Sequence, residues 1–489
     1  MFPQGPVGIP YQRWQAELMT TAVVVGSGPN GLAAALTLAA EGVDVTVLEA
    51  SDSPGGGTRS GEVTLPGLLH DHCSGFHPLA LDTGFSRQFD LAAHGLEWLW
   101  PEVQYAHPLH GGRGAAVVRS VEETAAGLGG DGSSYRRMFG PLSAHFHDIV
   151  GEFLQPMVHV PRHPFALGWF GVHAALPATV LARRWRTDGA RALFGGVAAH
   201  AFRPFGSVMS SAIGVALGTA AHRYGWPVAR GGSAAISRAM VSALESYGGR
   251  VETGALVRDH RELGRPDILM LNTAPAAAAS VLGSAQPPRI ARAYSRFRHG
   301  PGAFQVSYAV EGGIPWEYEP SRRAGTVHVG GNFEEIAAAE RDVVRGVMPD
   351  RPFVLVGQQS VADTGRASDG VHPVDVYAHV PSGWSGDATE IITAQIERYA
   401  PGFRARILST RSRSVAQIEQ ANPNYVGGDI ITGANTARQL VFRPRVTLQP
   451  YATGVPGAYL CSAAAPPGAG AHGMAGWNAA RAALADLAR

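Results

Sequence analysis

The sequence predicts an α/β protein with α+β insertions, in which a domain built on a parallel sheet is assembled from separated segments. Three observations predict this fold class. A β-branched run at residues 22–25 leads through a glycine-rich turn into a small-residue helix (31–40) and a second apolar strand (43–48). The same alternation returns at residues 230–257 and again near the C-terminus. The chain has 489 residues, 45% of them hydrophobic and 16% charged, which is enough for two or three domains.

The composition excludes several classes of protein. A formal net charge of +1 gives no reason to expect a nucleic-acid partner. All 40 basic residues are arginine, so lysine Schiff-base and lysine general-base mechanisms are excluded. The two cysteines, Cys73 and Cys461, form no C-x-x-C pair, and we expect no bound metal. The chain start lacks a charged segment followed by an apolar run, so we expect a cytoplasmic, bacterial protein without a signal peptide.

The remaining segments predict how the domains are divided. Residues 1–20 form an N-terminal extension. Residues 81–224 are a mostly helical insertion, with helical spacing at 180–194 and a buried helix within 205–221. Residues 289–415 are rich in alternating strands, at 303–310, 326–329 and 353–356. We therefore predict a discontinuous Rossmann-type domain (21–80, 225–288 and 416–489), with the two insertions together forming a substrate domain.

A G-x-G-x-x-G motif, Gly26 to Gly31, directly follows the first strand. Gly26 permits the tight turn, Gly28 lets the backbone approach a pyrophosphate, and Gly31 lets the helix pack close to the strand. The helix N-terminus then offers its N–H groups to the phosphate. Glu49 ends the second strand, at the spacing that accepts hydrogen bonds from ribose hydroxyls. This acid disfavours a 2′-phosphate, so the dinucleotide is predicted to be FAD or NAD rather than NADP.

A second glycine stretch, Gly55 to Gly57, follows Glu49, and together with the first motif it resembles a known family. The segment AVVVGSGPNGLAAALTLAAEGVDVTVLEASDSPGGGTRS resembles the FAD entry of the phytoene desaturase and amine oxidase superfamily. Four later segments extend the resemblance to the phytoene dehydrogenase-related branch, over nearly the whole chain. They are LPGLLHDHCSGFHPLA, Trp226 to Ser233, Asn422 to Asp429 and Tyr459 to Met474.

The resemblance implies FAD as the cofactor and assigns the residues that bind it. Gly55 and Gly56 are expected to line the ribityl and phosphate path, and Val257 to contact the adenine by its backbone. Ser462, Gly473 and Met474 are expected to meet the phosphate and the flavin. The full set of predicted cofactor-binding residues is Gly26, Gly28, Pro29, Asn30, Gly31, Glu49, Ala50, Gly55, Gly56, Gly57, Thr58, Val257, Ser462, Gly473 and Met474.

Candidate catalytic groups also follow from the resemblance, which places two segments beside the isoalloxazine. His77 and His472 lie in them and are candidate bases, since histidine titrates near neutrality. Tyr425 is a candidate lining residue of the substrate cavity. Many amine oxidases use a lysine near the reactive flavin nitrogen, and some relatives have one where Gln305 stands here, so amine oxidation by that route is disfavoured.

These residues predict an FAD-dependent oxidase, dehydrogenase or desaturase that removes hydride from an apolar small molecule such as a polyene, a terpenoid or another secondary metabolite. Oxygen or a quinone would be the electron acceptor. A redox-neutral isomerase of the carotenoid isomerase type and a flavin-binding protein with mainly an interaction role stay open as alternatives. Peripheral contact with a membrane is also open, although the sequence contains no strongly basic amphipathic helix.

Overall fold

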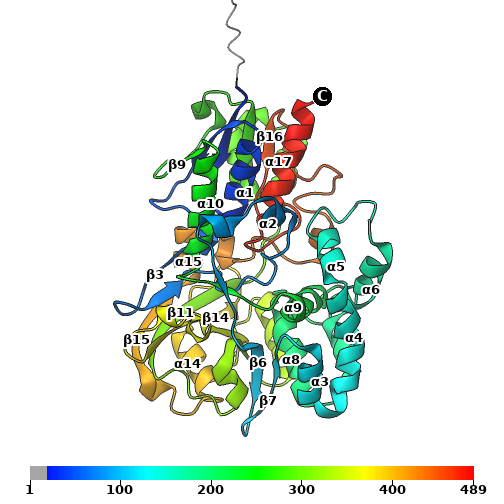
Figure 1. Cartoon of the computed structure of the whole chain (residues 1–489), viewed down its shortest axis with the longest axis vertical. Helices are drawn as coiled ribbons and strands as arrows, with labels where there is room; N and C mark the ends of the chain where they lie inside the picture. Colours follow the sequence, from blue (N-terminus) through cyan, green and yellow to red (C-terminus); the bar gives the residue numbers. More distant parts are fainter. Residues whose placement is uncertain (1–18) are drawn as a thin grey trace, which may run out of the picture.

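The computed structural model describes residues 19–489, so all but the last two residues of the predicted N-terminal extension, and the question of a signal peptide, lie outside the described residues. Figure 1 shows two sheet-containing lobes, one above the other, with a helical region along one side. The predicted fold class, an α/β protein with α+β insertions, is confirmed.

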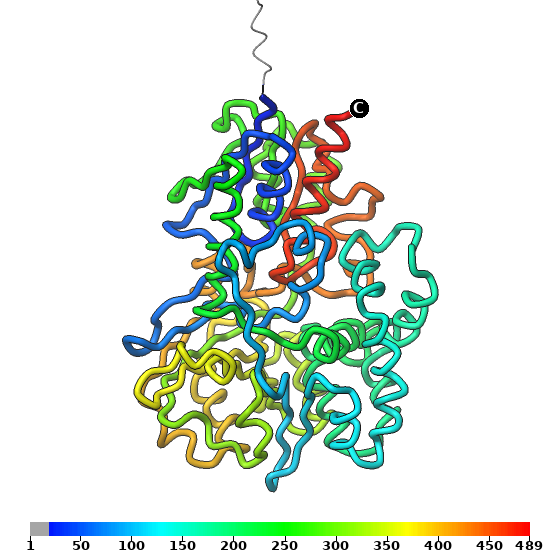
Figure 2. Tube along the Cα trace, viewed as in Figure 1, coloured from blue at the N-terminus to red at the C-terminus, as the bar shows by residue number. Residues whose placement is uncertain are grey.

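The upper lobe is a five-stranded parallel sheet in the order β16-β10-β1-β2-β9. Its strands come from the beginning, the middle and the end of the chain, as the tube in Figure 2 makes visible by colour. Helix α1 packs against both α10 and α17. The elements are β1 (Thr21–Val25), α1 (Pro29–Ala39), β2 (Asp44–Leu48), α2 (Gly84–Gln88), α10 (Ala234–Ser246), β9 (Arg250–Glu252), β10 (Ile268–Leu271), α11 (Pro275–Leu282), α12 (Pro288–Ser295), β16 (Ala458–Leu460) and α17 (Met474–Leu487).

The lower lobe is a seven-stranded mixed sheet in the order β15-β11-β14-β13-β12-β6-β7. All its pairs are antiparallel except that of β12 with β6, and a separate apolar core lies between the sheet and α14. The elements are β6 (Val103–Leu109), β7 (Arg113–Val117), β11 (Gly302–Glu311), β12 (Ala324–Val329), α13 (Phe333–Val344), β13 (Val354–Gly357), β14 (Val371–Val380), α14 (Thr389–Glu397), β15 (Ile407–Arg413) and α15 (Val415–Ala421).

The helical region and two small two-stranded sheets complete the described chain. The helices are α3 (Val121–Gly127), α4 (Gly132–Ala144), α5 (Phe146–Phe153), α6 (Pro164–Ala174), α7 (Ala178–Leu181), α8 (Asp188–Ala199), α9 (Ala212–Arg223) and α16 (Ala437–Val441). The two-stranded pairs are β3 (Ser60–Glu62) with β4 (Leu69–Asp71), and β5 (Trp98–Leu99) with β8 (Val228–Ala229).

The structure differs from the sequence expectations in three places. The segment 180–194 is not one helix, because the chain is extended at Trp185 between α7 and α8. The mostly helical insertion also supplies β6 and β7, which extend the mixed sheet. The strand expected within 250–257 ends at Glu252, so Val257 lies in the loop beyond it. The hydrophobic periodicity of a short segment does not show which distant strands it will pair with.

Candidate functional site

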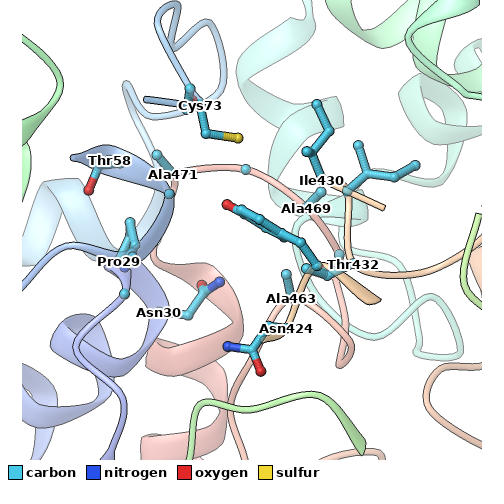
Figure 3. Close-up of a pocket in the computed structure, with 18 of the residues that line it drawn as sticks. Pro29, Asn30, Thr58, Cys73, Asn424, Ile430, Thr432, Ala463, Ala469 and Ala471 are labelled. Atoms are coloured by element: carbon cyan, nitrogen blue, oxygen red, sulfur yellow. The ribbon is translucent and has the colours of Figure 1, made fainter. Parts of the chain in front are cut away.

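A cavity of about 1200 Å³ runs between the two lobes and is lined by residues from both. Residues of the glycine-rich turn and Glu49 line one end. Residues of α6, α9, β12 and β13 line the other. Small-molecule pockets are commonly about 300–1,000 Å³, so this volume suits a cofactor and a substrate together. Figure 3 shows the middle of the cavity, with Cys73 directed into it from one side and Ile430 and Thr432 on the other.

The glycine-rich turn has the geometry of a phosphate cradle. Gly26 has φ +95°, a conformation that favours glycine, and a Cβ on Gly31 would collide with the Gly26 carbonyl. Gly28 precedes α1, and no side chain caps this helix, so its first N–H groups face the cavity end without an internal partner. The buried Oδ1 of Asn30, which lines the cavity, also has no partner among the described residues.

Asn272 fixes this turn, and the sequence reasoning did not select it as a functional residue. It follows β10, the neighbour of β1, and its Nδ2 donates to the Gly26 carbonyl at 3.1 Å. Its backbone N–H donates to the carbonyl of Val25 at 2.9 Å. The sequence did contain one signal that could have identified Asn272, because it directly follows a buried apolar strand. The carboxyl ends of parallel strands meet at one edge of the sheet, where ligands bind.

The second glycine stretch lies against the first. A Cβ on Gly56 would approach the Gly28 Cα to 3.0 Å, so the two backbones are in close contact. The Gly55 N–H donates to the Ser27 carbonyl and to its Oγ, each at 3.2 Å, and Gly55 has φ +123°. The hydroxyl of Thr58 donates to the Gly55 carbonyl at 2.8 Å. Only glycines fit this contact between the two backbones, which explains why glycine occurs at Gly28, Gly55 and Gly56.

Glu49 is held as a carboxylate beside the turn. Its Oε2 accepts from the backbone N–H (2.9 Å) and the hydroxyl (2.6 Å) of Ser27, and its Oε1 accepts from the Ser51 N–H at 2.9 Å. Burial alone would raise the pKa of Glu49, but these hydrogen bonds and the Arg59 guanidinium at 3.4 Å outweigh it and lower the pKa. A carboxylate has about four lone-pair positions, and these four donors occupy them, so a ribose hydroxyl would replace the longest contact, the one with Arg59.

The predicted cofactor-binding residues divide into two groups. One group lines the cavity: Gly26, Gly28, Pro29, Asn30, Glu49, Ala50, Gly56, Gly57, Thr58, Val257 and Ser462. The other, outside the lining, comprises Gly31, Gly55, Gly473 and Met474. Gly473 begins α17 with φ +70°, where a Cβ would come within 2.9 Å of Ala33, so it serves the packing of α17 on α1.

The two candidate bases line the cavity, but hydrogen bonds already hold their rings. His77 Nε2 lies 3.0 Å from the Ser233 hydroxyl, and burial lowers the pKa of His77 to about 3. His472 Nδ1 accepts from the Met474 backbone N–H at 3.1 Å, and burial lowers the pKa of His472 to about 4. Both imidazoles are therefore neutral near pH 7.

Tyr425 also lines the cavity and explains why glycine stands at position 57. Its hydroxyl occupies the space into which any Cβ on Gly57 would project. Burial raises the pKa of Tyr425 and of Cys73, so both groups are neutral. Arg59 pairs with Glu49 and donates to the Ser53 carbonyl at 3.0 Å.

Further residues line the cavity. Gln305, which the sequence analysis singled out, does so from β11. Arg413 lines it too and donates to the His72 carbonyl at 3.0 Å. His200 lines its far end. Within residues 19–489, no group of three or more His, Cys, Asp or Glu side chains is placed to hold a metal ion.

The residues present fit a dinucleotide. One end of the cavity combines uncapped N–H groups, a glycine cradle that a Cβ would fill, the unpartnered Asn30 oxygen and the ionised Glu49. Together the fold and the site define a class: a two-lobed protein with a Rossmann-like dinucleotide-binding domain.

Comparisons with known proteins place the chain within that class. The family model of the NAD(P)-binding Rossmann-like domain matches residues 24–83. Pyridine nucleotide-disulfide oxidoreductase domain-containing protein 2 of Rattus norvegicus is 25% identical over 302 residues, 54% of this chain and 52% of the relative. Hydroxyneurosporene desaturase of Cereibacter sphaeroides is 31% identical over 270 residues, 51% of this chain and 52% of the relative. The chain thus spans about half the length of the curated relatives it matches.

Solved structures show the same fold over nearly the whole chain. Putrescine oxidase bound to putrescine has a TM-score of 0.58 at 17% identity, covering 96% of this chain and 100% of that one. Cyclohexylamine oxidase from Brevibacterium oxydans has a TM-score of 0.56 at 17% identity, with the same coverage. The chain has the fold of these two oxidases, and the resemblance found in the sequence is confirmed.

Proposed function

We propose that the chain is an FAD-dependent oxidoreductase that removes hydride from an apolar small molecule of the polyene or terpenoid kind. The observation that carries the proposal is the single cavity that joins the dinucleotide turn to a chamber lined by apolar residues of α6 and α9. The hydroxyneurosporene desaturase similarity supports this substrate class. The absence of lysine argues against the lysine-assisted route of many amine oxidases.

The residues divide the work as follows. The α1 N-terminus, Gly28 and Gly56 would hold the pyrophosphate, and Glu49 a ribose hydroxyl. FAD, when bound, accepts a hydride without a metal. The apolar walls hold the substrate and exclude water. His77 and His472 are neutral, and burial has lowered the pKa of both, so each would hold an acquired proton only weakly and pass it on.

The outer face of α6 supports peripheral contact with a membrane as the route of an apolar substrate. Phe165, Trp169 and Val172 follow one another along this face and are 91%, 46% and 62% exposed. On the opposite face, Leu167 and Phe170 line the cavity. A helix that is apolar on all sides is normally covered all round. Exposed arginines precede α6 in the sequence, at Arg162, and follow α7, at Arg183, Arg184 and Arg186.

Positive side chains favour contact with an anionic bilayer surface, so we propose that a membrane covers the exposed face of α6. Among residues 19–489, a membrane-crossing length of apolar sequence occurs in no single helix, and only the pair formed by α6 and Ala178–Arg184 reaches it, bent by 92°. We expect co-sedimentation with phosphatidylcholine–phosphatidylserine vesicles. F165S/W169S is expected to abolish it, while V347S/L408S, which changes two other exposed apolar residues, is expected to leave it intact. Equal binding by both double variants would refute this contact.

The redox proposal is tested by purifying the chain, reconstituting it with FAD and screening polyenes and terpenoids for anaerobic bleaching of the flavin absorbance. We expect one equivalent of FAD per chain, bleaching by an apolar compound, and recovery of the colour on adding oxygen or a quinone. Failure to bind FAD would refute the proposal. Turnover by the reduced protein without net electron transfer would replace it with the redox-neutral isomerase.

A further inference from the structure

A cluster of four histidines lies at the end of the cavity away from the dinucleotide turn. His107 is on β6, His328 on β12 and His379 on β14, and all three side chains are fully buried in the mixed sheet. His200 directly follows α8 and is the member that lines the cavity. Part of its surface is accessible, in contrast to the other three. None of these four belongs to the dinucleotide site.

His200 is held in place by His328. The two Nε2 atoms are 2.9 Å apart, which requires that one donates and the other accepts. The Nε2 of His107 donates to the Gly331 carbonyl at 2.7 Å, and the buried Nδ1 atoms of His107 and His328 have no partner among the described residues. The Trp226 ring lies 5.5 Å from His200 in an edge-on arrangement and fixes its other side.

The Nδ1 of His200 is the one polar atom of this pair that is not enclosed. No hydrogen bond to it occurs within residues 19–489, and it is absent from the fully enclosed unpartnered atoms. Apolar side chains of α9, among them Ile213 and Ala216, line the cavity around this end. A lone polar atom in such surroundings is what a ligand pocket uses to orient an otherwise apolar molecule.

The backbone just after His200 is strained. Phe202, two residues beyond His200, has φ +50°, which is costly for an aromatic residue. Its ring stacks on His379 at a centroid distance of 3.7 Å and on Tyr377 at 6.1 Å. Tyr377 is another residue that lines the cavity. The packing therefore holds the His200 turn in a conformation it would not adopt alone.

We propose that His200, positioned by His328, is a distal subsite that binds a neutral oxygen function, foremost a hydroxyl, at the end of an apolar substrate. The inference rests on the proposed function, because it specifies the substrate of that cavity. A hydroxyl both donates and accepts, so it pairs with Nδ1 in either tautomer of His200. Burial lowers the pKa of His200 to about 3, so the imidazole offers a hydrogen bond rather than a charge.

The test compares two probes of equal size, dodecan-1-ol and tridecane, in FAD-reconstituted protein. Their affinities are measured by displacement of diphenylhexatriene fluorescence. We expect H200L to weaken dodecan-1-ol binding about tenfold and to leave tridecane binding within about twofold, as loss of one hydrogen bond to a neutral group predicts. H328L is expected to weaken dodecan-1-ol binding by a smaller factor, because His200 loses the group that positions it.

Two further variants keep the test decisive. H200N places an amide near the former Nδ1 and is expected to recover part of the alcohol affinity, which a purely structural role of His200 would not predict. His222 is buried, bonded to the Tyr135 hydroxyl and outside the cavity lining, so H222L is the matched control and is expected to change neither affinity.

The outcomes separate the two proposals. An alcohol-to-alkane affinity ratio that is the same in H200L as in the unaltered protein would overturn the subsite, and so would binding of neither probe. If FAD absorbance is retained while the ratio does not change, the subsite alone fails. If no FAD binds but the ratio still depends on His200, the redox function fails and the subsite stands.

Discussion

Arg366 makes the strongest prediction about stability, because its guanidinium pairs with two buried carboxylates, those of Asp71 and Asp363. Its side chain is 0% exposed. Nη1 donates to Asp71 Oδ2 at 2.5 Å, Nε to Asp363 Oδ2 at 3.1 Å, and Nη2 to the Ala229 carbonyl at 2.8 Å. Asp71 directly precedes the segment that carries His72, Cys73 and His77, so the network also positions the wall of the site.

The variant R366M removes the cation between two buried carboxylates, although Asp71 keeps its bonds from Ser60 and Ser233 and Asp363 keeps its bond from the Gly231 N–H. Removal of one partner of a buried ion pair costs about 3–5 kcal/mol, and we expect a loss of that size in the free energy of unfolding. Guanidinium denaturation, followed by circular dichroism, measures it. R230M breaks the exposed pair of Arg230 with Glu97 and should cause no resolvable loss.

The triple variant D71N/D363N/R366M removes the uncompensated charges and should recover part of the stability lost in R366M. The reasoning is refuted if R366M unfolds at the same denaturant concentration as the unaltered protein. It is refuted equally if the triple variant is less stable than R366M, because the penalty would then not come from unpaired buried charge.

Three other predictions concern the dinucleotide end. E49Q is expected to weaken FAD binding about ten- to hundredfold by flavin fluorescence titration, while E41Q, at an exposed glutamate, should not change it. The folded state lowers the pKa of Glu49, so the ionised Glu49 contributes its full stabilisation above the ordinary carboxyl pKa and loses it as the pH falls through the lowered pKa. In an acid titration of the free energy of unfolding, E49Q should therefore lack this loss of stability. G57A should lose about 1–3 kcal/mol of stability through collision with the Tyr425 hydroxyl, and G57A/Y425F should regain most of it; no regain would contradict the packing argument.

The sequence was sufficient for the dinucleotide end because the constraints there are local. A strand, a turn that needs glycine and an acid after the next strand lie within about thirty residues of chain, and each has its own physical signature. The position of Asn272 could not be read in this way. It depends on β10 pairing with β1, which joins residues separated by some 250 positions. The expected end of the β9 strand at Val257 was wrong for a similar reason, since its pairing with β2 ends at Glu252.

Histidine shows where sequence reasoning stops and why. Nearness to flavin-binding motifs selected His77 and His472, yet the same nearness gives each a backbone or hydroxyl partner, since buried polar atoms must be satisfied. His200 occurs in a segment with no motif, and its significance comes from β12, which supplies His328 to hold it. His200 is informative because its Nδ1 has no hydrogen-bond partner among the described residues and apolar side chains line the cavity around it. That property is set by packing between separate elements, so it exists only in the folded chain.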